Sequence, residues 1–202
     1  DGALTTSKAV AITVTNVGNE DPVFTSAGTA SFKENGAGTV YTAAATPDAG
    51  QTLTYSISGA DASLFNINAT TGAVTFKSSP NYEAPTDAGG NNVYDLDITA
   101  SDGTNSATKA VAISVTNVNE APTITSAATA SFAENASGTV YTVAATDQDA
   151  GATLTYSLTG TDAARFNINS TTGAITFKSS PNYEAPADSG KNNVYDVTVR
   201  AS

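Results

Sequence analysis

Residues 61–85 read DASLFNINATTGAVTFKSSPNYEAP, and residues 162–186 read DAARFNINSTTGAITFKSSPNYEAP. Only four of these 25 positions differ, and the two stretches are offset by 101 residues. Two near-copies at a fixed period indicate two successive copies of one structural module. A module of about 100 residues is long enough to bury a core of its own.

The frame of the repeat predicts where each module begins and ends. The dipeptide Asp-Gly at positions 1–2 recurs at positions 102–103, so the sequence enters the repeat part of the way through a module. We therefore expect three pieces. They are the last strand of a preceding module at residues 1–17, a complete module at 18–118, and a second module lacking its last strand at 119–202.

Short runs of alternating apolar residues, separated by turn residues, fill the complete module. This pattern is typical of a β-sandwich. We expect an all-β fold of tandem immunoglobulin-like Greek-key sandwiches, each with seven antiparallel strands. Most tyrosines and phenylalanines fall at inward positions, which favours a core role over a stacking platform for sugars or bases. The expected strands are Thr29–Lys33, Thr39–Ala45, Leu53–Ile57, Phe65–Ile67, Val74–Phe76, Tyr94–Ile98 and Val111–Val115.

The composition excludes several classes of site. The chain has no Cys, His, Met or Trp, which rules out thiol nucleophiles, imidazole bases and the usual zinc and haem ligands. There are 19 acidic residues against 8 basic ones, a formal net charge of −11. Such a charge disfavours nucleic acid and anionic lipid as partners. No apolar run approaches the roughly 20 residues of a membrane span, so we expect no membrane insertion in this segment.

Acidic residues recur in loops that are expected to share one end of a module. Glu34 and Glu83 lie in two such loops, and Glu120 follows the last strand. The loop of the next module with Asp147 and Asp149 is expected to face the same junction. Carboxylates gathered there repel one another, by about 4 kcal/mol per pair at ~4 Å and an effective dielectric near 20. Two things would relieve this repulsion: the uptake of protons by the carboxylates, or a calcium ion, which takes six to eight oxygen ligands. Simple solvation of exposed acids is the remaining alternative.

Three motifs occur in a fixed order along the repeat. They are Glu34-Asn35 in the turn after the first strand, ATDQDAG at residues 145–151, and NVNEAP at residues 117–122. This ordered set resembles the cadherin repeat, with its Glu-Asn turn, ATDxDxG motif and linker, and more closely its relatives in large bacterial surface adhesins. The resemblance implies Ca²⁺ held by carboxylate and amide side chains. The candidate ligands are Glu34, Asn81, Glu83, Asp102, Asn117, Asn119, Glu120, Glu134, Asp147, Asp149, Glu184, Asp48, Asn16 and Glu20.

Departures from the family pattern fall mainly in the first module. Thr46-Pro47-Asp48 replaces the acidic pair with one residue deleted, and the linker at residues 16–22 carries an extra residue. We therefore expect the joint before Pro22 to bind calcium more weakly and to flex more than the central junction, where two ions are expected. An EF-hand beginning at Asp147 is disfavoured, since its twelfth position is Leu158.

The resemblance implies a non-catalytic, calcium-stiffened repeat segment of an extracellular adhesin or surface fibre, acting in cell adhesion or in matrix or biofilm attachment. It implies an extracellular, secreted or cell-surface location, in a bacterium, with neighbouring identical modules or chains as partners. Two alternatives remain open. The modules could bind polysaccharide through the loop at residues 84–92, or the chain could be a filament subunit in which residues 4–17 complete a neighbouring chain.

Overall fold

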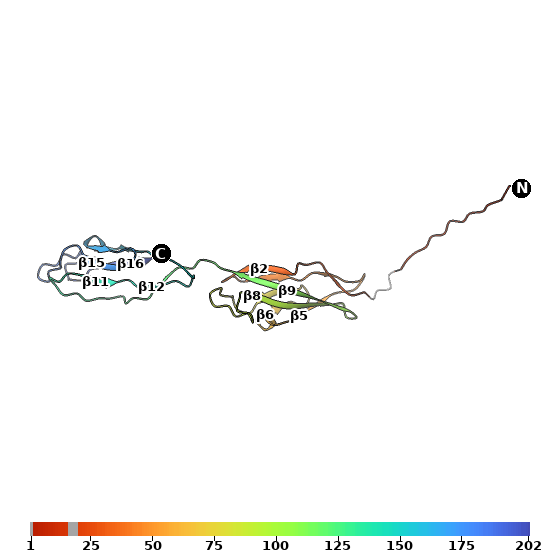
Figure 1. Cartoon of the computed structure of the whole chain (residues 1–202), viewed down its shortest axis with the longest axis horizontal. Helices are drawn as coiled ribbons and strands as arrows, with labels where there is room; N and C mark the ends of the chain where they lie inside the picture. The colour runs from red at the N-terminus through yellow and green to blue at the C-terminus, as the bar shows by residue number, and fades with distance from the viewer. Residues whose placement is uncertain (1, 16–19) are drawn as a thin grey trace. The chain divides into compact units, whose positions relative to one another are not determined.

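The computed structural model of the chain describes residues 2–15 and 20–202, and Figure 1 traces their strands along the chain. The chain divides into two compact units, residues 1–117 (the first unit) and residues 118–202 (the second unit). Regular structure is almost all strand, interrupted by the short 3-10 turns η1 (Ala62–Leu64) and η2 (Ala163–Arg165). Among the described residues, no helix has the length and apolarity needed to cross a membrane.

The first unit is a β-sandwich of two main sheets. The four-stranded sheet has the order β2-β9-β8-β5, and these strands lie together in Figure 1. The three-stranded sheet has the order β3-β7-β6, and β1 pairs with β4 separately. The strands are β1 (Val23–Phe24), β2 (Thr29–Lys33), β3 (Thr39–Thr42), β4 (Ala45–Thr46), β5 (Thr54–Ser58), β6 (Phe65–Ile67), β7 (Ala73–Phe76), β8 (Val93–Ser101) and β9 (Ser106–Thr116).

Two features of the first unit differ from the expected strands. β2 pairs with β9 in parallel, with Thr29 opposite Ala112, so the expectation of antiparallel strands throughout is wrong for this pair. A parallel pair needs a long connection, and β2 and β9 come from the two ends of the module. The expected strand Thr39–Ala45 is divided into β3 and β4, because it changes its partner: β3 pairs with β7, whereas β4 pairs with β1.

The core of the first unit follows the predicted alternation. In β8, Tyr94, Leu96 and Ile98 are buried, whereas Asp95 and Asp97 are exposed. Full burial of one such apolar side chain stabilises the fold by roughly 1.5–3 kcal/mol. The neighbouring strand in the same sheet, β9, buries the apolar residues Val111, Ile113 and Val115.

The aromatic residues confirm the core interpretation. The rings of Phe65 and Phe76 have centroids 4.2 Å apart, and Tyr94 meets Phe76 edge-on at 5.0 Å. Such tilted and edge-to-face contacts add stability beyond the buried area. Tyr82 and Tyr183 depart from this pattern and are exposed.

The second unit repeats the strand arrangement with fewer strands. Its sheets have the orders β11-β15-β14, β13-β16 and β10-β12. Its hydrophobic core is smaller than that of the first unit, and the buried apolar residues are Val143, Phe166 and Ile175. The strands are β10 (Thr123–Ile124), β11 (Thr139–Thr142), β12 (Ala145–Thr146), β13 (Tyr156–Thr159), β14 (Phe166–Ile168), β15 (Ala174–Phe177) and β16 (Thr198–Ala201).

Candidate metal centre

Glu34 lies in the turn that follows β2, and the turn points its side chain inward. The N–H of Glu34 donates to the carbonyl oxygen of Thr116 at the end of β9, at 3.1 Å. The next residue, Asn35, has φ of 57° and donates its N–H to Pro80 at 2.9 Å. Asparagine tolerates this left-handed conformation better than most residues, which accounts for the Glu-Asn pair. Glu34 is consequently only 2% exposed.

The loop between β7 and β8 is attached to the same carboxylate. The N–H of Tyr82 donates to Oε2 of Glu34 at 2.8 Å. The amide of Asn92 in turn donates from Nδ2 to the carbonyl oxygen of Tyr82 at 2.8 Å. These bonds hold the next residue, Glu83, near Glu34.

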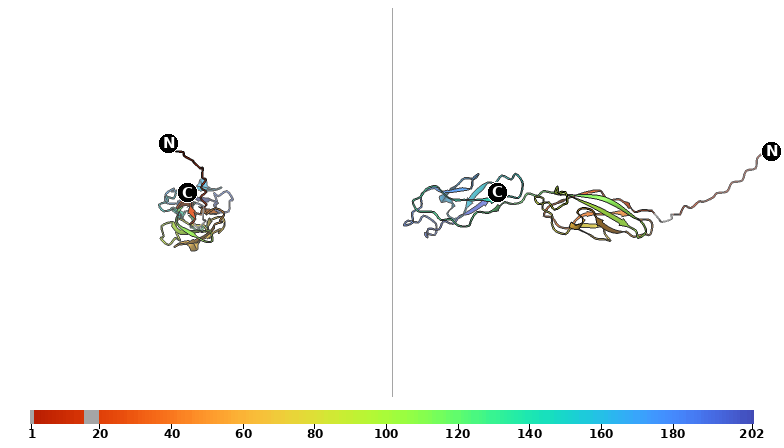
Figure 2. Two further views of the ribbon diagram at one scale, coloured as in Figure 1. Left: turned by 90° about the vertical axis from the view of Figure 1, so that its right-hand side faces the viewer. Right: turned by 60° about the horizontal axis from the view of Figure 1, so that its bottom comes forward.

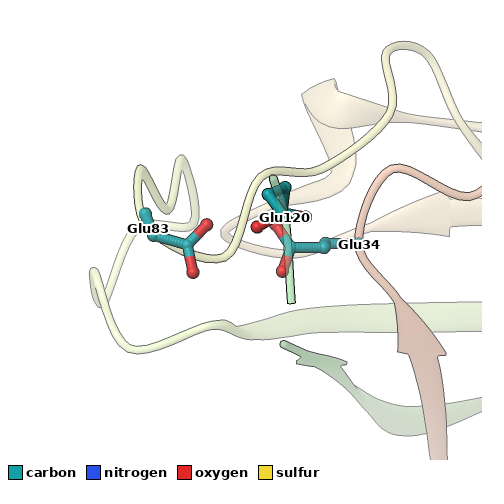
Figure 3. Close-up of side chains that lie close together, drawn as sticks. All are labelled: Glu34, Glu83 and Glu120. Carbon is teal, nitrogen blue, oxygen red and sulfur yellow. The ribbon is translucent and has the colours of Figure 1, made fainter. Parts of the chain in front are cut away.

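Three carboxylates form what we call the acidic cluster, made of Glu34, Glu83 and Glu120. One oxygen from each lies within 4.8 Å of the other two, with Glu34 buried and the other two partly buried. Figure 3 shows the carboxylates turned toward one another from three separate segments of the chain. Glu120 comes from the segment after β9, four residues past Thr116.

The acidic cluster meets the requirements of a calcium ion. Oxygens bound to one Ca²⁺ at 2.3–2.6 Å can be at most about 5.2 Å apart, and the observed limit of 4.8 Å falls within this range. The donors are all oxygen, as a hard cation requires. Partial burial strengthens the mutual repulsion of the carboxylates. A bound cation would therefore relieve more repulsion here than between carboxylates on an open surface.

A second group of predicted ligands lies at the opposite end of the first unit. Asp102 follows the last residue pair of the β8–β9 hairpin, Ser101 and Ser106, whereas Glu34 lies beside the other end of β9. At about 3.3 Å per residue, a strand of this length spans roughly 35 Å. Asp102 and Glu34 therefore cannot share an ion.

Hydrogen bonds within its own turn hold the carboxylate of Asp102. Its Oδ1 accepts the N–H groups of Asn105 and Thr104, both at 2.8 Å. The bonds from Asn105 and then Thr104 lower the pKa of Asp102 from its ordinary value of 3.8. Asp102 therefore stays ionised well into the acid range, as a cation ligand must.

Asp48 lies at the same end of the first unit as Asp102. The loop of Asp48 leads into β5, whose first residue, Thr54, pairs with Ser101. The N–H of Glu20 donates to Oδ2 of Asp48 at 2.8 Å, which joins two predicted ligands directly. A third, Asn16, lies outside the described residues.

The second unit repeats this connection between linker and loop. The N–H of Glu120 donates to Oδ2 of Asp149 at 2.9 Å, and the N–H of Asp149 donates to Oδ1 of Asp147 at 3.0 Å. Asp147 and Asp149 are both partly buried. Backbone N–H groups of the linker and of the loop itself thus hold the carboxylates of Asp147 and Asp149 in place.

The remaining acidic candidates of the second unit are exposed. Oε2 of Glu134 accepts the N–H of Tyr183 at 3.0 Å, as Glu34 does from Tyr82, but Glu134 and Glu184 are both exposed. The equivalents of two members of the acidic cluster therefore lie in solvent here. Among the described residues, a group of three close carboxylates occurs only in the acidic cluster.

The predicted asparagine ligands have local roles in the structure. Oδ1 of Asn81 accepts the N–H of Ala84 at 3.0 Å, which closes a turn beside Glu83. Asn119 donates from Nδ2 to the carbonyl oxygen of Glu120 at 3.1 Å, and Asn117 is exposed. A side-chain oxygen can accept a hydrogen bond and still offer a second lone pair to a cation.

Sequence reasoning missed a set of buried carboxylates that organise the loop at residues 84–92. Oδ1 of Asp61 accepts the N–H of Ala88 at 2.7 Å, and its Oδ2 accepts the N–H of Asp95 at 2.8 Å. Asp87 accepts two further N–H groups from its own loop. The available signal was their exact recurrence at Asp162 and Asp188, in the same repeat register.

Asp188 shows the balance that makes such burial possible. Burial raises the pKa of its carboxyl, but hydrogen bonds from the N–H groups of Asn192 and Asn193 more than offset this and lower the pKa overall. These bonds measure 2.9 and 3.0 Å. The buried aspartates thus substitute for backbone acceptors and hold a loop in place.

Comparison with known proteins identifies the fold as cadherin-like. The chain is 32% identical over 193 residues to human cadherin EGF LAG seven-pass G-type receptor 2, and equally so to the mouse protein, covering 90% of this chain. It spans only 6% of the length of these relatives. No family model matches the chain.

Solved structures agree with this assignment. Human protocadherin-24 EC1-2 is similar with a TM-score of 0.63 and 20% identity, covering 91% of this chain and 94% of that chain. Drosophila N-cadherin EC1-4 is similar with a TM-score of 0.56 and 22% identity, covering 91% of this chain and 48% of that chain. The sequence-based expectation of an immunoglobulin-like cadherin sandwich is therefore confirmed.

Proposed function

We propose that the chain is a calcium-binding, non-catalytic repeat segment of an extracellular adhesion protein. The observation that carries this proposal is the convergence of the carboxylates of Glu34, Glu83 and Glu120 within 4.8 Å. Three segments separated in sequence supply one oxygen each, and one of these carboxylates is buried by the fold. The cadherin-like fold supports adhesion as the context for such a site.

Calcium would act on the segment that follows β9. Glu120 lies in this segment, whereas Glu34 and Glu83 belong to the sandwich of the first unit. An ion bound to all three would tie the linker to the sandwich and restrict its rotation. We propose that further ligands come from the predicted set in the same linker and in the loop of Asp147 and Asp149, and that the bound ions stiffen the repeat array.

The wider setting follows from the same proposal. We place the chain outside the cell or on its surface, in a bacterial adhesin or surface fibre, with identical modules or neighbouring chains as its partners in adhesion or in matrix or biofilm attachment. The net charge of −11 suits an extracellular calcium-rich medium. The polysaccharide alternative has less support, because buried aspartates fix the loop at residues 84–92 from within.

Calcium titration by calorimetry, with thermal unfolding in excess calcium and in chelator, tests the proposal. Saturable binding is expected, and at a hundredfold excess over the dissociation constant calcium should stabilise the fold by about 2.7 kcal/mol. Magnesium at the same concentration should have a smaller effect, because it needs a tighter octahedron. Identical unfolding curves in calcium and chelator would contradict the proposal.

A further inference from the structure

The differences between the two copies of the repeat gather around one pocket of the second unit. Between residues 60–95 and 161–196, eight of 36 positions differ. All residues that line this pocket fall within 161–196, so each has a counterpart in the first unit. Five of the eight differing positions line the pocket, and they are Thr161, Ala164, Arg165, Ala187 and Ser189.

The walls of the pocket come mainly from three segments. They are η2, the residues after β15, and the loop at residues 185–193, all in the unit at the blue end of the colour scale in Figure 2. The volume of about 440 Å³ falls within the range of small-molecule sites. Because Arg165 and Lys178 both line it, we call it the cationic pocket.

Arg165 replaces an apolar contact of the first unit. Its counterpart Leu64 is partly buried and packs against the first core, whereas Arg165 is exposed. Among the described residues, the guanidinium group of Arg165 has no hydrogen-bond or ion-pair partner. Its N–H donors are therefore available to a ligand.

A second cation lies beside Arg165, at a cost in stability. Just beyond the pairing of β14 with β15, the N–H of Lys178 donates to the carbonyl oxygen of Arg165 at 2.8 Å. Like charges at such neighbouring positions of antiparallel strands are destabilising. In the first unit, the N–H of Lys77 donates to the carbonyl oxygen of an uncharged residue, Leu64. The second copy therefore carries a charge repulsion that the first copy lacks.

A third cation is placed by a strained backbone. Lys191 has φ of 55°, a left-handed conformation that is uncommon for residues other than glycine, and its counterpart Gly90 has φ of 62°. Nζ of Lys191 donates to the carbonyl oxygen of Pro186 at 3.3 Å, next to Ala187 in the pocket wall. Strain of this kind persists where a function requires it. The repulsion beside Arg165 and the strain at Lys191 would both be offset by a bound anion.

The buried carboxylate in the wall of the pocket is shielded from a ligand. Asp162 is 3% exposed, and its two oxygens accept the N–H groups of Ser189 and Asp196 at 2.7 and 2.9 Å. These bonds offset its charge and hold Ser189 in the pocket wall. The wall is thus ordered before a ligand arrives, which lowers the cost of binding.

We propose that the cationic pocket binds the carboxylate group of an acidic sugar. Arg165, Lys178 and Lys191 surround it and are three of the four basic residues of the second unit. A guanidinium group can bind both oxygens of a carboxylate, and each lysine ammonium group can donate further hydrogen bonds.

The uncharged lining favours a sugar as the carrier of the carboxylate. Hydroxyl-bearing side chains line the pocket beside the cations, and they can exchange hydrogen bonds with the hydroxyl groups of a sugar. They are Thr161, Ser179, Ser180 and Ser189. The first unit offers no equivalent site, because Leu64 and Gly90 leave Lys77 as the single cation among the three counterparts. The inference therefore concerns the second unit alone, and it does not depend on calcium.

Calorimetric titration of the chain with trigalacturonate gives the first test. Calcium is removed beforehand with a chelating resin, because soluble chelators are themselves polycarboxylates and calcium binds uronates. Saturable binding at one site per chain is expected, and the uncharged methyl ester of the same sugar should bind at least about tenfold more weakly. Equal binding of the ester would overturn the proposal and leave the calcium proposal intact.

Inorganic sulfate separates a free anion from an anion carried by a sugar. Sulfate offers the charge without the sugar hydroxyls, so it should bind at least about tenfold more weakly than trigalacturonate. Sulfate that binds as tightly as the sugar would overturn the assignment of a sugar ligand.

Two variants that each restore the residue of the first unit test the pocket. Arg165→Leu should weaken trigalacturonate binding by about tenfold or more. Arg200→Thr removes the same charge outside the pocket lining and restores the counterpart Thr99, so binding should change by less than about twofold. Equal effects of the two variants would show that the net charge alone attracts the ligand, and would overturn the proposal.

Transfer of the site to the first unit gives a converse test. The triple variant Leu64→Arg, Thr86→Ala and Gly90→Lys gives the first unit the side chains of the second at these positions. The number of trigalacturonate sites per chain should rise from one to two. A value of one in the triple variant would contradict the assignment of these residues.

Sedimentation in the same calcium-free buffer distinguishes a sugar from the acidic groups of a second copy of the chain. The wild-type chain and Arg165→Leu should show the same monomeric mass of 20.2 kDa. Association of the wild-type chain that disappears in Arg165→Leu would identify a second copy as the occupant, and would overturn the assignment of a sugar.

Discussion

Glu34→Gln removes one negative charge from the acidic cluster while keeping the size of the side chain. The amide oxygen of glutamine can still accept the N–H of Tyr82, which donates to Glu34 at 2.8 Å. The substitution therefore separates the effect of the negative charge on stability from the effect of the hydrogen bond to Tyr82.

The size of the effect follows from the geometry of the cluster. At the observed limit of 4.8 Å, each pair of charges repels by about 0.9 kcal/mol in water and about 3.5 kcal/mol at an effective dielectric of 20. Loss of Glu34 removes two of the three pairs. In chelator, Glu34→Gln should consequently raise the free energy of unfolding by about 1–2 kcal/mol, taking the water value as the safer guide.

In calcium the sign should reverse. The wild-type chain gains about 2.7 kcal/mol at a hundredfold excess over its dissociation constant, and the variant forfeits most of this gain with its ligand. For a unit of this size, a gain of that order raises the unfolding temperature by about 10 °C or more. Calorimetric unfolding of both proteins in both buffers measures the four values needed.

The matched control is Glu134→Gln. Glu134 occupies the same turn of the second unit and accepts the same kind of backbone bond, from Tyr183, but it is exposed. Its substitution should change the free energy of unfolding by less than about 0.5 kcal/mol, in calcium and in chelator alike. A loss of stability in Glu34→Gln that is equal in the two buffers would refute the reasoning, because Glu34 would then serve only the turn.

Three further predictions concern the sandwich itself. Gly72 has φ of 68°, and a Cβ there would lie 2.4 Å from the carbonyl oxygen of Ala43, so Gly72→Ala should lower the free energy of unfolding in denaturant titrations by at least about 1–3 kcal/mol. Asp61→Ala leaves two backbone N–H groups without their acceptor and should cost about 2–4 kcal/mol by the same measurement, whereas exposed Asp97→Ala should cost less than about 0.5 kcal/mol. The pKa of Asp102 is lower in the folded state than its ordinary value of 3.8, so its stabilisation is present at neutral pH and is lost as the pH falls through the folded-state value. Asp102→Asn should therefore flatten the acid limb of stability against pH, and an unchanged limb would contradict the assignment.

Local sequence patterns predicted most of the fold. Alternation in β8 predicted which side chains are buried, because a strand presents successive residues to opposite faces. The short strands β1 and β10 were not predicted, since two-residue pairings leave no periodic signal in the sequence. The parallel pairing of β2 with β9 was also missed, because register between strands from the two ends of a module depends on the assembled sandwich.

The candidate metal site could be predicted from the sequence only in part. The Glu-Asn turn at Glu34 and the loop of Glu83 could be assigned to one end of the module by counting alternate loops. Burial of individual carboxylates could not be predicted in this way. Asp61 and Asp87 accept backbone N–H groups, and Glu34 accepts one as well, from Tyr82. What distinguishes Glu34 is its position beside two further carboxylates, Glu83 and Glu120. Only three-dimensional placement separates an acid that holds a loop from an acid that can hold an ion.

The hydrogen bonds from the two linkers show that fixing the linker and binding an ion depend on different residues. Asp48 and Asp149 each accept a backbone N–H from a linker glutamate, Glu20 or Glu120, at 2.8 and 2.9 Å. The second loop adds the carboxylate of Asp147, whereas the first loop has a proline in that region. The linker bond is thus retained where the acidic pair is lost. In chelator, the backbone N–H groups of Glu20 and Glu120 should therefore be equally protected from hydrogen exchange. Added calcium should increase protection at Glu120 alone, and an equal increase at both residues would show that the acidic pair does not set the affinity.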